Sequence, residues 1–545
     1  MSLDPTRFTK ARVGAPLPDA VDVAIVGAGM GGLTAGAYLA RAGFSVACFD
    51  SHYVAGGCVT QFMRGPKHKR YSFDVGLHYI GDCGPSGQIP TILRGIGVEQ
   101  EYVPLDPDGF DVIVLPELTF KIPVGIDRYR DRLVETFPKE KKGIDRYVRF
   151  LKEVDFAGRS MSKSNDKQTA GFLVGMLVKG RLVARYQNAT IGEFLDTCTH
   201  DPVLRAVMLG QSGDYGLPPS QVSAVLHAGL ANHYFKGAVY PRGGGQIIAD
   251  RIAEALEGAG GSIHLRRGIS KILMTDGRAS GVRTQPFRGE VKDVQARIVL
   301  SGADLKHTLV DLVGVENLPE RWVKRTESFE MGGAIFLTCL GVAADMSEKG
   351  MGNCNYWQFD STDMEKVYAQ ADAGAIEPHC AYITCATLKD PSTQHAPEGI
   401  SNVEVMTLVP GKASAWGVSV DDMRSGRYRQ DGAYLAKKAA VEENLIQRLD
   451  NLFPGAADQI VFRESATPVT HSRYTQATDG TGYGLAATPA QFLKGRPSNR
   501  GPLPDLFLCG ASTRSGHGVV GAMRSGYLAA VKISDALGKP IKPRS

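Results

Sequence analysis

The feature that most constrains this chain is a glycine-rich turn close to the N-terminus. An apolar run, residues 23–26, leads directly into Gly27, Gly29, Gly31 and Gly32. Gly27 permits a tight turn, Gly29 lets a pyrophosphate approach the backbone, and Gly32 lets the next helix pack close to the strand. The N-terminus of that helix offers free N–H groups and a positive dipole end to phosphates. The segment therefore predicts a βαβ unit that wraps the ADP half of a dinucleotide.

The residues after the second predicted strand, 46–49, indicate which dinucleotide is bound. Asp50 follows this strand roughly 20 residues after the glycines, where a carboxylate accepts hydrogen bonds from ribose hydroxyls. Gly56 and Gly57 come next and allow a second stretch of backbone to close over the pyrophosphate. This arrangement favours a flavin over a nicotinamide. The predicted cofactor contacts of this segment also include Ser51, Cys58 and Val59.

A second glycine-rich turn lies near the C-terminus, where the apolar run 506–511 leads into an expected helix. The N-terminus of this helix is predicted to reach the flavin ring or its ribityl chain. We also expect the strand that begins at Ile269 to run beside the adenine. The predicted cofactor contacts of the C-terminal turn are Gly510, Gly518, Val519 and Val520. Glycine motifs at opposite ends of the chain together predict FAD as the cofactor.

Composition excludes several classes of function. Lys and Arg number 62 against 57 Asp and Glu, and a net charge of +5 on 545 residues is too small to indicate nucleic-acid binding. The nine cysteines are scattered without a C-x-x-C pair. That spacing predicts reduced thiols in a reducing compartment, and it argues against a zinc site, so we predict no metal site.

The sequence shows neither a secretory signal in its polar first twenty residues nor an apolar run of about 18 residues. Residues 171–186 mix apolar and cationic side chains. Such a segment is typical either of a peripheral contact with the membrane interface or of a helix that caps a substrate tunnel or packs in the core. We therefore expect a cytoplasmic or peripheral membrane protein.

A chain of 545 residues predicts two or more domains. The order of apolar runs and glycine turns predicts an α/β fold, in which a Rossmann-like FAD-binding domain is interleaved with an α+β substrate domain. A short extension, 1–20, precedes both. The predicted ranges are 21–100, 235–305 and 496–545 for the FAD-binding domain, and 101–234 and 306–495 for the substrate domain.

Several segments carry a resemblance to a known family. They are AGGC at 55–58, SFDVGLHYIG at 72–81, TFPKE at 136–140, NHY at 232–234 and YPRGG at 240–244. With the flavin motifs, these residues resemble the FAD-dependent family of phytoene desaturases, carotenoid isomerases and retinol saturases, and most of all its retinol saturase-like members. The resemblance covers most of the first 300 residues and thins out afterwards, and the C-terminal turn matches the saturase version less well.

The resemblance implies hydride transfer at a flavin, to or from a carbon–carbon bond of a long apolar unsaturated substrate such as a retinoid, carotenoid or fatty acyl chain. An apolar tunnel with few polar groups suits such a substrate. The protein must also supply or accept a proton. The candidate groups for this are His78, Tyr79, His233 and Tyr234, each of which has the alternative role of satisfying a backbone group. Arg242 is predicted to bind the cofactor, or alternatively to pair with Asp74.

Three alternatives share this fold. A carotenoid cis–trans isomerase uses reduced FAD without net oxidation of its substrate. An amine oxidase requires an aromatic cage beside the flavin, and no such pair stands out in the sequence. A non-enzymatic prenyl-binding carrier has lost its flavin. Because only one complete dinucleotide fingerprint is present, the sequence does not predict a dedicated NAD(P)H domain, and the electron donor or acceptor stays open.

Overall fold

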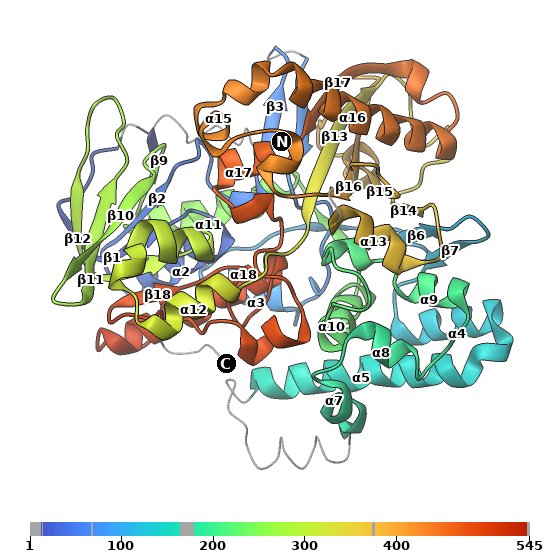
Figure 1. Cartoon of the computed structure of the whole chain (residues 1–545), viewed down its shortest axis with the longest axis horizontal. Coiled ribbons are helices and arrows are strands. Elements are labelled where there is room, and N and C mark those ends of the chain that lie inside the picture. Colours follow the sequence, from blue (N-terminus) through green and yellow to red (C-terminus); the bar gives the residue numbers. More distant parts are fainter. Residues whose placement is uncertain (1–11, 14, 67–68, 164–178, 373–375, 542–545) are drawn as a thin grey trace.

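The N-terminal glycine turn belongs to a seven-stranded sheet that forms one side of the molecule (Figure 1). The computed structural model describes residues 12–13, 15–66, 69–163, 179–372 and 376–541. The strand order is β10-β11-β12-β1-β2-β9, and β18 pairs with the C-terminal half of β12. The strands are β1 (Ala20–Val26), β2 (Val46–Asp50), β9 (Ser262–Leu265), β10 (Ile269–Thr275), β11 (Arg278–Thr284), β12 (Asp293–Ser301) and β18 (Leu506–Leu508).

Strands β9, β2, β1, β12 and β18 are parallel, whereas β10 and β11 form an antiparallel hairpin on the edge. The parallel strands read as continuous apolar runs because helices and loops cover them, and Val23, Ala24 and Ile25 are fully buried. The edge hairpin is part of the same sheet, since β11 pairs with β12.

Three long helices pack on this sheet and on one another: α2 (Met30–Arg41), α11 (Gln246–Gly258) and α18 (Gly518–Ala536). The contact between α2 and α18 is so close that a Cβ atom on Gly526 would lie 2.2 Å from the carbonyl oxygen of Gly31. Because Gly526 has no side chain, α2 and α18 can pack this closely.

Gly526→Ala is expected to lower the free energy of unfolding by about 1–3 kcal/mol, because the added methyl group forces the two helices apart. Gly258→Ala is the matched control: Gly258 is also helical, and among the described residues no heavy atom lies within 4 Å of the position that its added methyl group would take. Urea unfolding of the two variants measures the difference, and equal stabilities would contradict the tight α2–α18 contact.

A second seven-stranded sheet, at the right of Figure 1, has the order β17-β13-β16-β15-β14-β6-β7. Its strand pairs are antiparallel except β6 and β14. The strands are β6 (Asp111–Val114), β7 (Thr119–Ile122), β13 (Ala334–Val342), β14 (Asn355–Phe359), β15 (Cys380–Cys385), β16 (Ser401–Val409) and β17 (Ile460–Ala466).

A group of helices lies below this second sheet in Figure 1 and shares a hydrophobic core with it. These helices are α4 (Ile126–Thr136), α5 (Lys141–Lys163), α7 (Arg181–Tyr186), α8 (Ile191–Leu195), α9 (Pro202–Met208) and α10 (Ala224–Phe235). The remaining helices are α3 (Gln88–Gly95), α12 (Glu320–Ser328), α13 (Met364–Asp372), α14 (Ala386–Lys389), α15 (Val420–Ser425), α16 (Gly432–Leu452) and α17 (Pro468–Thr475).

Two small two-stranded sheets connect the two large sheets. The hairpin of β3 (Gln61–Arg64) and β4 (Tyr71–Asp74) lies against β16, and β5 (Tyr102–Pro104) pairs with β8 (Val239–Pro241). The loop after β4 is fixed to β8 by the bridge between Ile80 and Val239. This places the segment 75–80 between the two sheets. The domain boundaries given above remain predictions.

The segment 171–186 is only partly described, and residues 171–178 lie outside the described ranges. In its described part, α7 buries Leu182 and Val183 in the core. These two side chains therefore pack inside the protein, and membrane contact remains a prediction for the rest of the segment. No helix in the described part of the chain combines the length and apolarity needed to cross a bilayer. The nine cysteines are unpaired.

Candidate active site

A cavity of about 1020 Å³ runs between the two sheets. One end is lined by the glycine turns after β1 and β18, and the other by side chains of the second sheet and of α10. Its volume is at the upper limit of common ligand pockets, as expected for a site that holds a cofactor and a substrate together.

The glycine end of the cavity provides the geometry that a pyrophosphate requires. Gly29 forms a backbone bridge with Gly56 and is the N-cap of α2, with no side chain to block the helix N-terminus. A Cβ on Gly29 would point into the cavity, since its nearest described neighbour is the Cα of Gly57 at 3.9 Å. Gly32 lies behind the wall, where a Cβ would sit 2.1 Å from the Gly27 carbonyl oxygen. The two glycines thus serve ligand approach and helix packing respectively.

Asp50 is held in a fixed orientation at the cavity wall. Its Oδ2 accepts a hydrogen bond from the backbone N–H of Ala28 at 2.7 Å, and its Oδ1 accepts one from His52 N–H at 2.8 Å. Each carboxylate oxygen keeps a second acceptor position, as the bonding of a ribose hydroxyl requires. These residues therefore fit the ADP half of FAD.

The structure brings nearly all the predicted cofactor residues to one cavity. Those that line it are Gly27, Gly29, Gly31, Asp50, Ser51, Gly56, Gly57, Cys58, Val59, Ile269, Gly510, Gly518, Val519 and Val520. The structure shows where these residues lie, and their roles in cofactor binding remain predictions.

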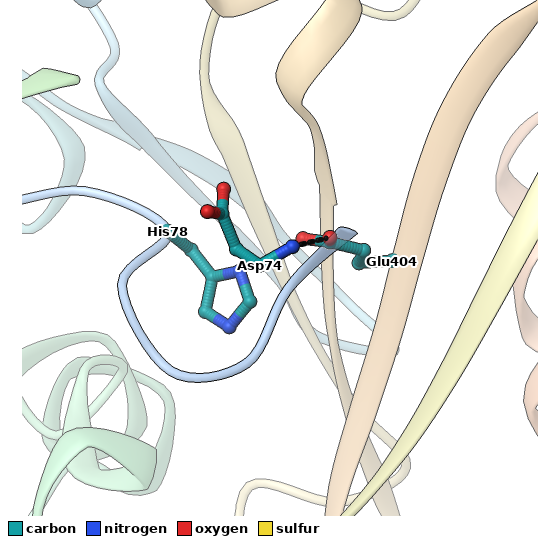
Figure 2. Close-up of side chains that lie close together, drawn as sticks. All are labelled: Asp74, His78 and Glu404. Atoms are coloured by element: carbon teal, nitrogen blue, oxygen red, sulfur yellow. Dashed lines mark hydrogen bonds and ion pairs between the residues drawn. The ribbon is translucent and has the colours of Figure 1, made fainter. Parts of the chain in front are cut away.

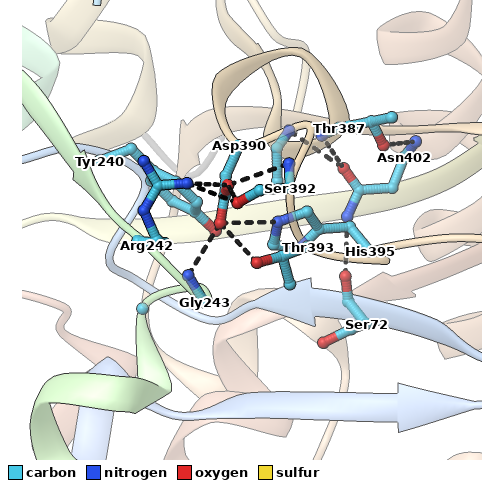
Figure 3. Close-up of polar contacts among 12 residues, drawn as sticks. Ser72, Tyr240, Arg242, Gly243, Thr387, Asp390, Ser392, Thr393, His395 and Asn402 are labelled. Carbon is cyan, nitrogen blue, oxygen red and sulfur yellow. Dashed lines mark hydrogen bonds and ion pairs between the residues drawn. The ribbon is translucent and has the colours of Figure 1, made fainter. Parts of the chain in front are cut away.

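Arg242 is not among the residues that line this cavity. Figure 3 shows it in a polar cluster with Asp390 and Ser392. Its guanidinium donates to the Ser392 hydroxyl at 2.6 Å and forms ion pairs with Glu101 at 3.0 Å and Asp390 at 3.7 Å. Asp74, the alternative partner, instead accepts hydrogen bonds from the Tyr240 hydroxyl and from Gly245 N–H. The structure therefore supports neither sequence-based role of Arg242. The reason is that the β8 turn directs this side chain toward the loop after α14.

His78 faces the cavity from a buried polar cluster (Figure 2). Its Nδ1 lies 2.8 Å from Glu404 Oε2, and its Nε2 has no hydrogen-bond partner among the described residues. Glu404 Oε1 accepts the backbone N–H of Asp74 at 2.7 Å. Lys389, which is also buried, donates from Nζ to the His78 carbonyl oxygen at 2.6 Å.

The charges of this cluster perturb one another. Burial, and then the charge of Glu404, raises the pKa of Asp74 to about 7, and burial lowers the pKa of Lys389 to about 8. Although Asp74, His78 and Glu404 offer ligand atoms within 4.8 Å of one another, their oxygen atoms already accept hydrogen bonds, and Lys389 supplies a cation. We therefore interpret the cluster as a hydrogen-bonded network.

Tyr79 and Tyr234 stack face to face at the cavity wall, with ring centroids 4.2 Å apart. The Tyr79 hydroxyl lies between two carboxyl groups, 3.1 Å from Asp111 Oδ2 and 3.0 Å from Asp214 Oδ2. Burial raises the pKa of Asp111 to about 6 and, with the charge of Asp111, that of Asp214 to about 7. Carboxyl groups with such pKa values exchange protons near neutral pH.

His233 has the structural role that was its alternative interpretation. Its Nε2 accepts the backbone N–H of Gly81 at 2.7 Å, and burial lowers its pKa to about 3. A neutral ring that accepts a backbone hydrogen bond holds the loop 78–82 and does not donate a proton from that nitrogen.

The far end of the cavity is apolar and aromatic. Its walls include Val225, Leu226, Leu230, Ile335, Leu337, Trp357, Phe359, Tyr368, Tyr382, Met406, Leu408, Tyr483 and Phe492. Such a chamber excludes water and suits an apolar chain.

Four residues of the site were not assigned a role from the sequence: Asp111, Asp214, Lys389 and Glu404. Each is a single charged residue within an apolar element or short turn. A charge inside an apolar run such as that of β16 is the signal that indicates a buried partner.

Two segments match described protein families. Residues 25–95 match the NAD(P)-binding Rossmann-like domain, and residues 429–534 match the flavin-containing amine oxidoreductase family. These matches cover the two glycine turns that meet at the cavity.

Relatives of known name match nearly the whole chain. The all-trans-retinol 13,14-reductase of Danio rerio is 29% identical over 91% of this chain and 83% of its own length. The human protein of the same name is 27% identical over 94% and 85%, and prolycopene isomerase 1 of an Oncidium hybrid is 26% identical over 95% and 84%. The chain is thus similar over nearly its whole length to retinol 13,14-reductases and prolycopene isomerases. Together with the two family matches, this similarity indicates a flavin oxidoreductase, and the Rossmann-like domain implies a flavin cofactor.

Solved structures confirm the predicted fold. An oxidoreductase from Methanosarcina mazei superposes with a TM-score of 0.60 at 16% identity, over 93% of this chain and 99% of its own. Cyclohexylamine oxidase from Brevibacterium oxydans superposes with a TM-score of 0.58 at 16% identity, over 95% and 100%. At this identity the likeness shows the fold alone, a Rossmann-like FAD-binding domain with an amine oxidase-type substrate domain.

Proposed function

We propose that this protein is an FAD-dependent enzyme that reduces a carbon–carbon double bond in a long apolar polyene, a retinoid or a carotenoid. The observation that carries the proposal is the continuity of one cavity from the glycine turns to the aromatic chamber. The relatives named for all-trans-retinol and for prolycopene, both long unsaturated hydrocarbon chains, support it.

In this proposal the glycine end binds FAD. The N–H groups at the start of α2 and α18 face the phosphates and the flavin, Asp50 accepts hydrogen bonds from the ribose, and Gly29 and Gly57 leave space for the pyrophosphate. The bound flavin supplies hydride chemistry. The protein's own contribution is to orient the polyene in a dry chamber, where Leu337, Met406 and Leu408 replace water around the chain.

Polar groups reach this chamber at one wall, where His78 and Tyr79 follow each other in the chain. Both side chains are fixed by carboxyl groups, His78 by Glu404 and Tyr79 by Asp111 and Asp214. An arrangement with proton-exchanging groups on one side of an apolar chamber favours a reaction that combines hydride and proton transfer.

The test starts from the absorbance spectrum of the purified protein, followed by anaerobic reduction with dithionite and addition of a panel of polyenes. A flavin spectrum, with reoxidation by all-trans-retinol or a carotenoid and a product heavier by two hydrogens, is the expected result. A product of unchanged mass but altered geometry indicates the isomerase alternative. Flavin reduction by an amine indicates an amine oxidase, and a colourless protein indicates the carrier.

Leu337→Trp is expected to raise the polyene concentration needed for half-maximal reoxidation at least tenfold, because the indole fills the chamber that the buried leucine lines. Flavin content should be unchanged. Val461→Trp, at an exposed site on β17, is the matched control and should behave as the wild type. An unaltered response of Leu337→Trp would show that the substrate lies elsewhere.

A further inference from the structure

The strongest unexplained feature at the cavity is the position of the Tyr79 hydroxyl between two carboxyl groups. It lies 3.1 Å from Asp111 Oδ2 and 3.0 Å from Asp214 Oδ2. A phenol carries one hydrogen and donates it to one acceptor. A hydrogen on one of the carboxyl groups gives the second oxygen–oxygen contact a donor of its own. The Tyr79 hydroxyl and the two carboxyl groups then hold two protons between them, one from the phenol and one from a carboxyl group.

The surroundings of Asp111 favour its ionised form. Its Oδ2 accepts from Gln211 Nε2 at 2.7 Å and its Oδ1 accepts from Asn355 Nδ2 at 2.8 Å, in addition to the contact with Tyr79. The charge of Lys389 also acts on it. A carboxylate is an acceptor only, and three donors with a nearby cation stabilise its charge.

The surroundings of Asp214 favour its neutral form. The hydroxyls of Tyr79 and Tyr234 interact with its carboxyl group and lower its pKa, but burial and the charge of Asp111 raise the pKa by more. The side chains of Tyr382 and Tyr483 also interact with Asp214, and His517 interacts with its backbone. The negative charge of Asp111 opposes a second charge at Asp214. Tyr79 therefore donates to Asp111 and accepts from Asp214. In a buried site, two neighbouring carboxylates repel each other. One of the two groups therefore keeps its proton.

The backbone of Asp214 is fixed at the junction of the two ends of the cavity. It closes the short turn η3 (Ser212–Asp214), which Tyr483 holds by donating to the Gly213 carbonyl oxygen at 2.7 Å. The ring of His517 forms a hydrogen bond with the Asp214 backbone. Since His517 is the N-cap of α18, the turn that carries Asp214 is attached to the helix terminus predicted to face the flavin.

We propose that Asp214 is the proton donor of the reaction, a neutral carboxylic acid whose proton is shared with Asp111 through the Tyr79 hydroxyl. This inference rests on the proposed function. The π bond of the polyene accepts a hydride from reduced flavin at one carbon, and its electron pair takes the Asp214 proton at the next. The substrate gains the two electrons that the flavin loses, one C–H bond forms at each carbon, and Asp214 becomes a carboxylate.

His78 is less suited to this donor role. Its Nδ1 is engaged with Glu404 Oε2 at 2.8 Å, and its Nε2 is buried without a hydrogen-bond partner among the described residues. His78 therefore acts as an acceptor or a positioning group, and the acid is Asp214, which contacts the next residue along the same wall, Tyr79.

The test compares Asp214→Asn with Asp111→Asn by infrared spectroscopy of the holoenzyme in H₂O and D₂O at neutral pH. The wild type should show the carbonyl stretch of a protonated carboxylic acid, shifted in D₂O. Asp74, whose pKa is also raised to about 7, contributes an acid band of its own, so the comparison is made in an Asp74→Asn background. In that background we expect the band to be absent from Asp214→Asn. Because Asn resembles the neutral acid, this variant should also keep the wild-type flavin content and should not fall below the wild-type Tm, whereas Asp111→Asn replaces an ionised acceptor of three donors and should lower the Tm.

A second readout is the pH dependence of stability. The folded-state pKa of Asp214 is raised to about 7 from 3.8, so its contribution to stability is present below about pH 4 and is lost as the pH rises through 7. Asp214→Asn lacks this loss. Its Tm relative to that of the wild type should therefore increase between pH 4 and pH 8.

The same variants separate the two proposals in single-turnover reactions with reduced flavin. Reoxidation of Asp214→Asn by a polyene should slow at least 100-fold and lose its solvent isotope effect, while dithionite reduction stays unchanged. An acid band that survives in Asp214→Asn overturns the proton assignment, and a wild-type reoxidation rate in this variant overturns the donor role. A wild-type enzyme that shows the band but reduces no polyene overturns the proposed function and, with it, the donor step.

Discussion

Replacing Gly29 by valine should give a folded protein that purifies almost free of flavin. In the structure the Cβ of residue 29 points into the cavity, with the Cα of Gly57 at 3.9 Å as its nearest described neighbour. The isopropyl group therefore meets no protein atom at close range but occupies the space that the pyrophosphate requires. The ratio of flavin absorbance to protein absorbance measures the loss, and the Tm of the apoprotein reports the fold.

Gly84→Val is the matched control for this experiment. Among the described residues no heavy atom lies within 4 Å of the Cβ that this substitution adds. This variant should retain flavin as the wild type does. If Gly29→Val retained a full complement of flavin, the turn after β1 would not be the pyrophosphate site, and the proposed function would lose its cofactor.

Lys389→Met should lower the free energy of unfolding by about 3–5 kcal/mol, because it leaves buried carboxylates without their cation. The ammonium group is almost fully buried and donates to the His78 carbonyl oxygen at 2.6 Å. The charges of Glu404, Asp111 and Asp74 all act on it. Chemical denaturation at neutral pH measures the loss.

Two further variants make the Lys389 result specific. Lys324→Met removes an exposed lysine that pairs with Glu320, and it should change stability little. Adding Asp74→Asn to Lys389→Met removes one uncompensated carboxylate, so the double variant should recover part of the loss. Additive effects of the two substitutions would show that the cluster is not coupled in this way.

The cofactor end of the site could be predicted from the sequence because its parts are local. The turn that contains Gly27, Gly29 and Gly32 lies between a strand and a helix that follow each other directly, and Asp50 ends the next strand. Each role depends on backbone conformation within one βαβ unit, which a short pattern specifies.

The chemistry of the substrate end depends on pairs that no spacing rule connects. Tyr79 was predicted from its neighbourhood, but its partners Asp111 and Asp214 come from β6 and from a turn after α9. Glu404 reaches His78 from β16. Arg242 illustrates the converse, since a cation close to a glycine turn in sequence is directed away from the cavity by its tertiary ion pairs.

The pairing of β18 with β12, and of α18 with α2, has a consequence for biosynthesis. The ribosome synthesises β1, α2 and β2 long before it synthesises β18 and α18, which pair with and pack on them or their neighbours. The nascent protein thus holds an incomplete nucleotide fold for most of its translation. In the proposed function, the complete flavin site can therefore form only after β18 and α18 have been synthesised.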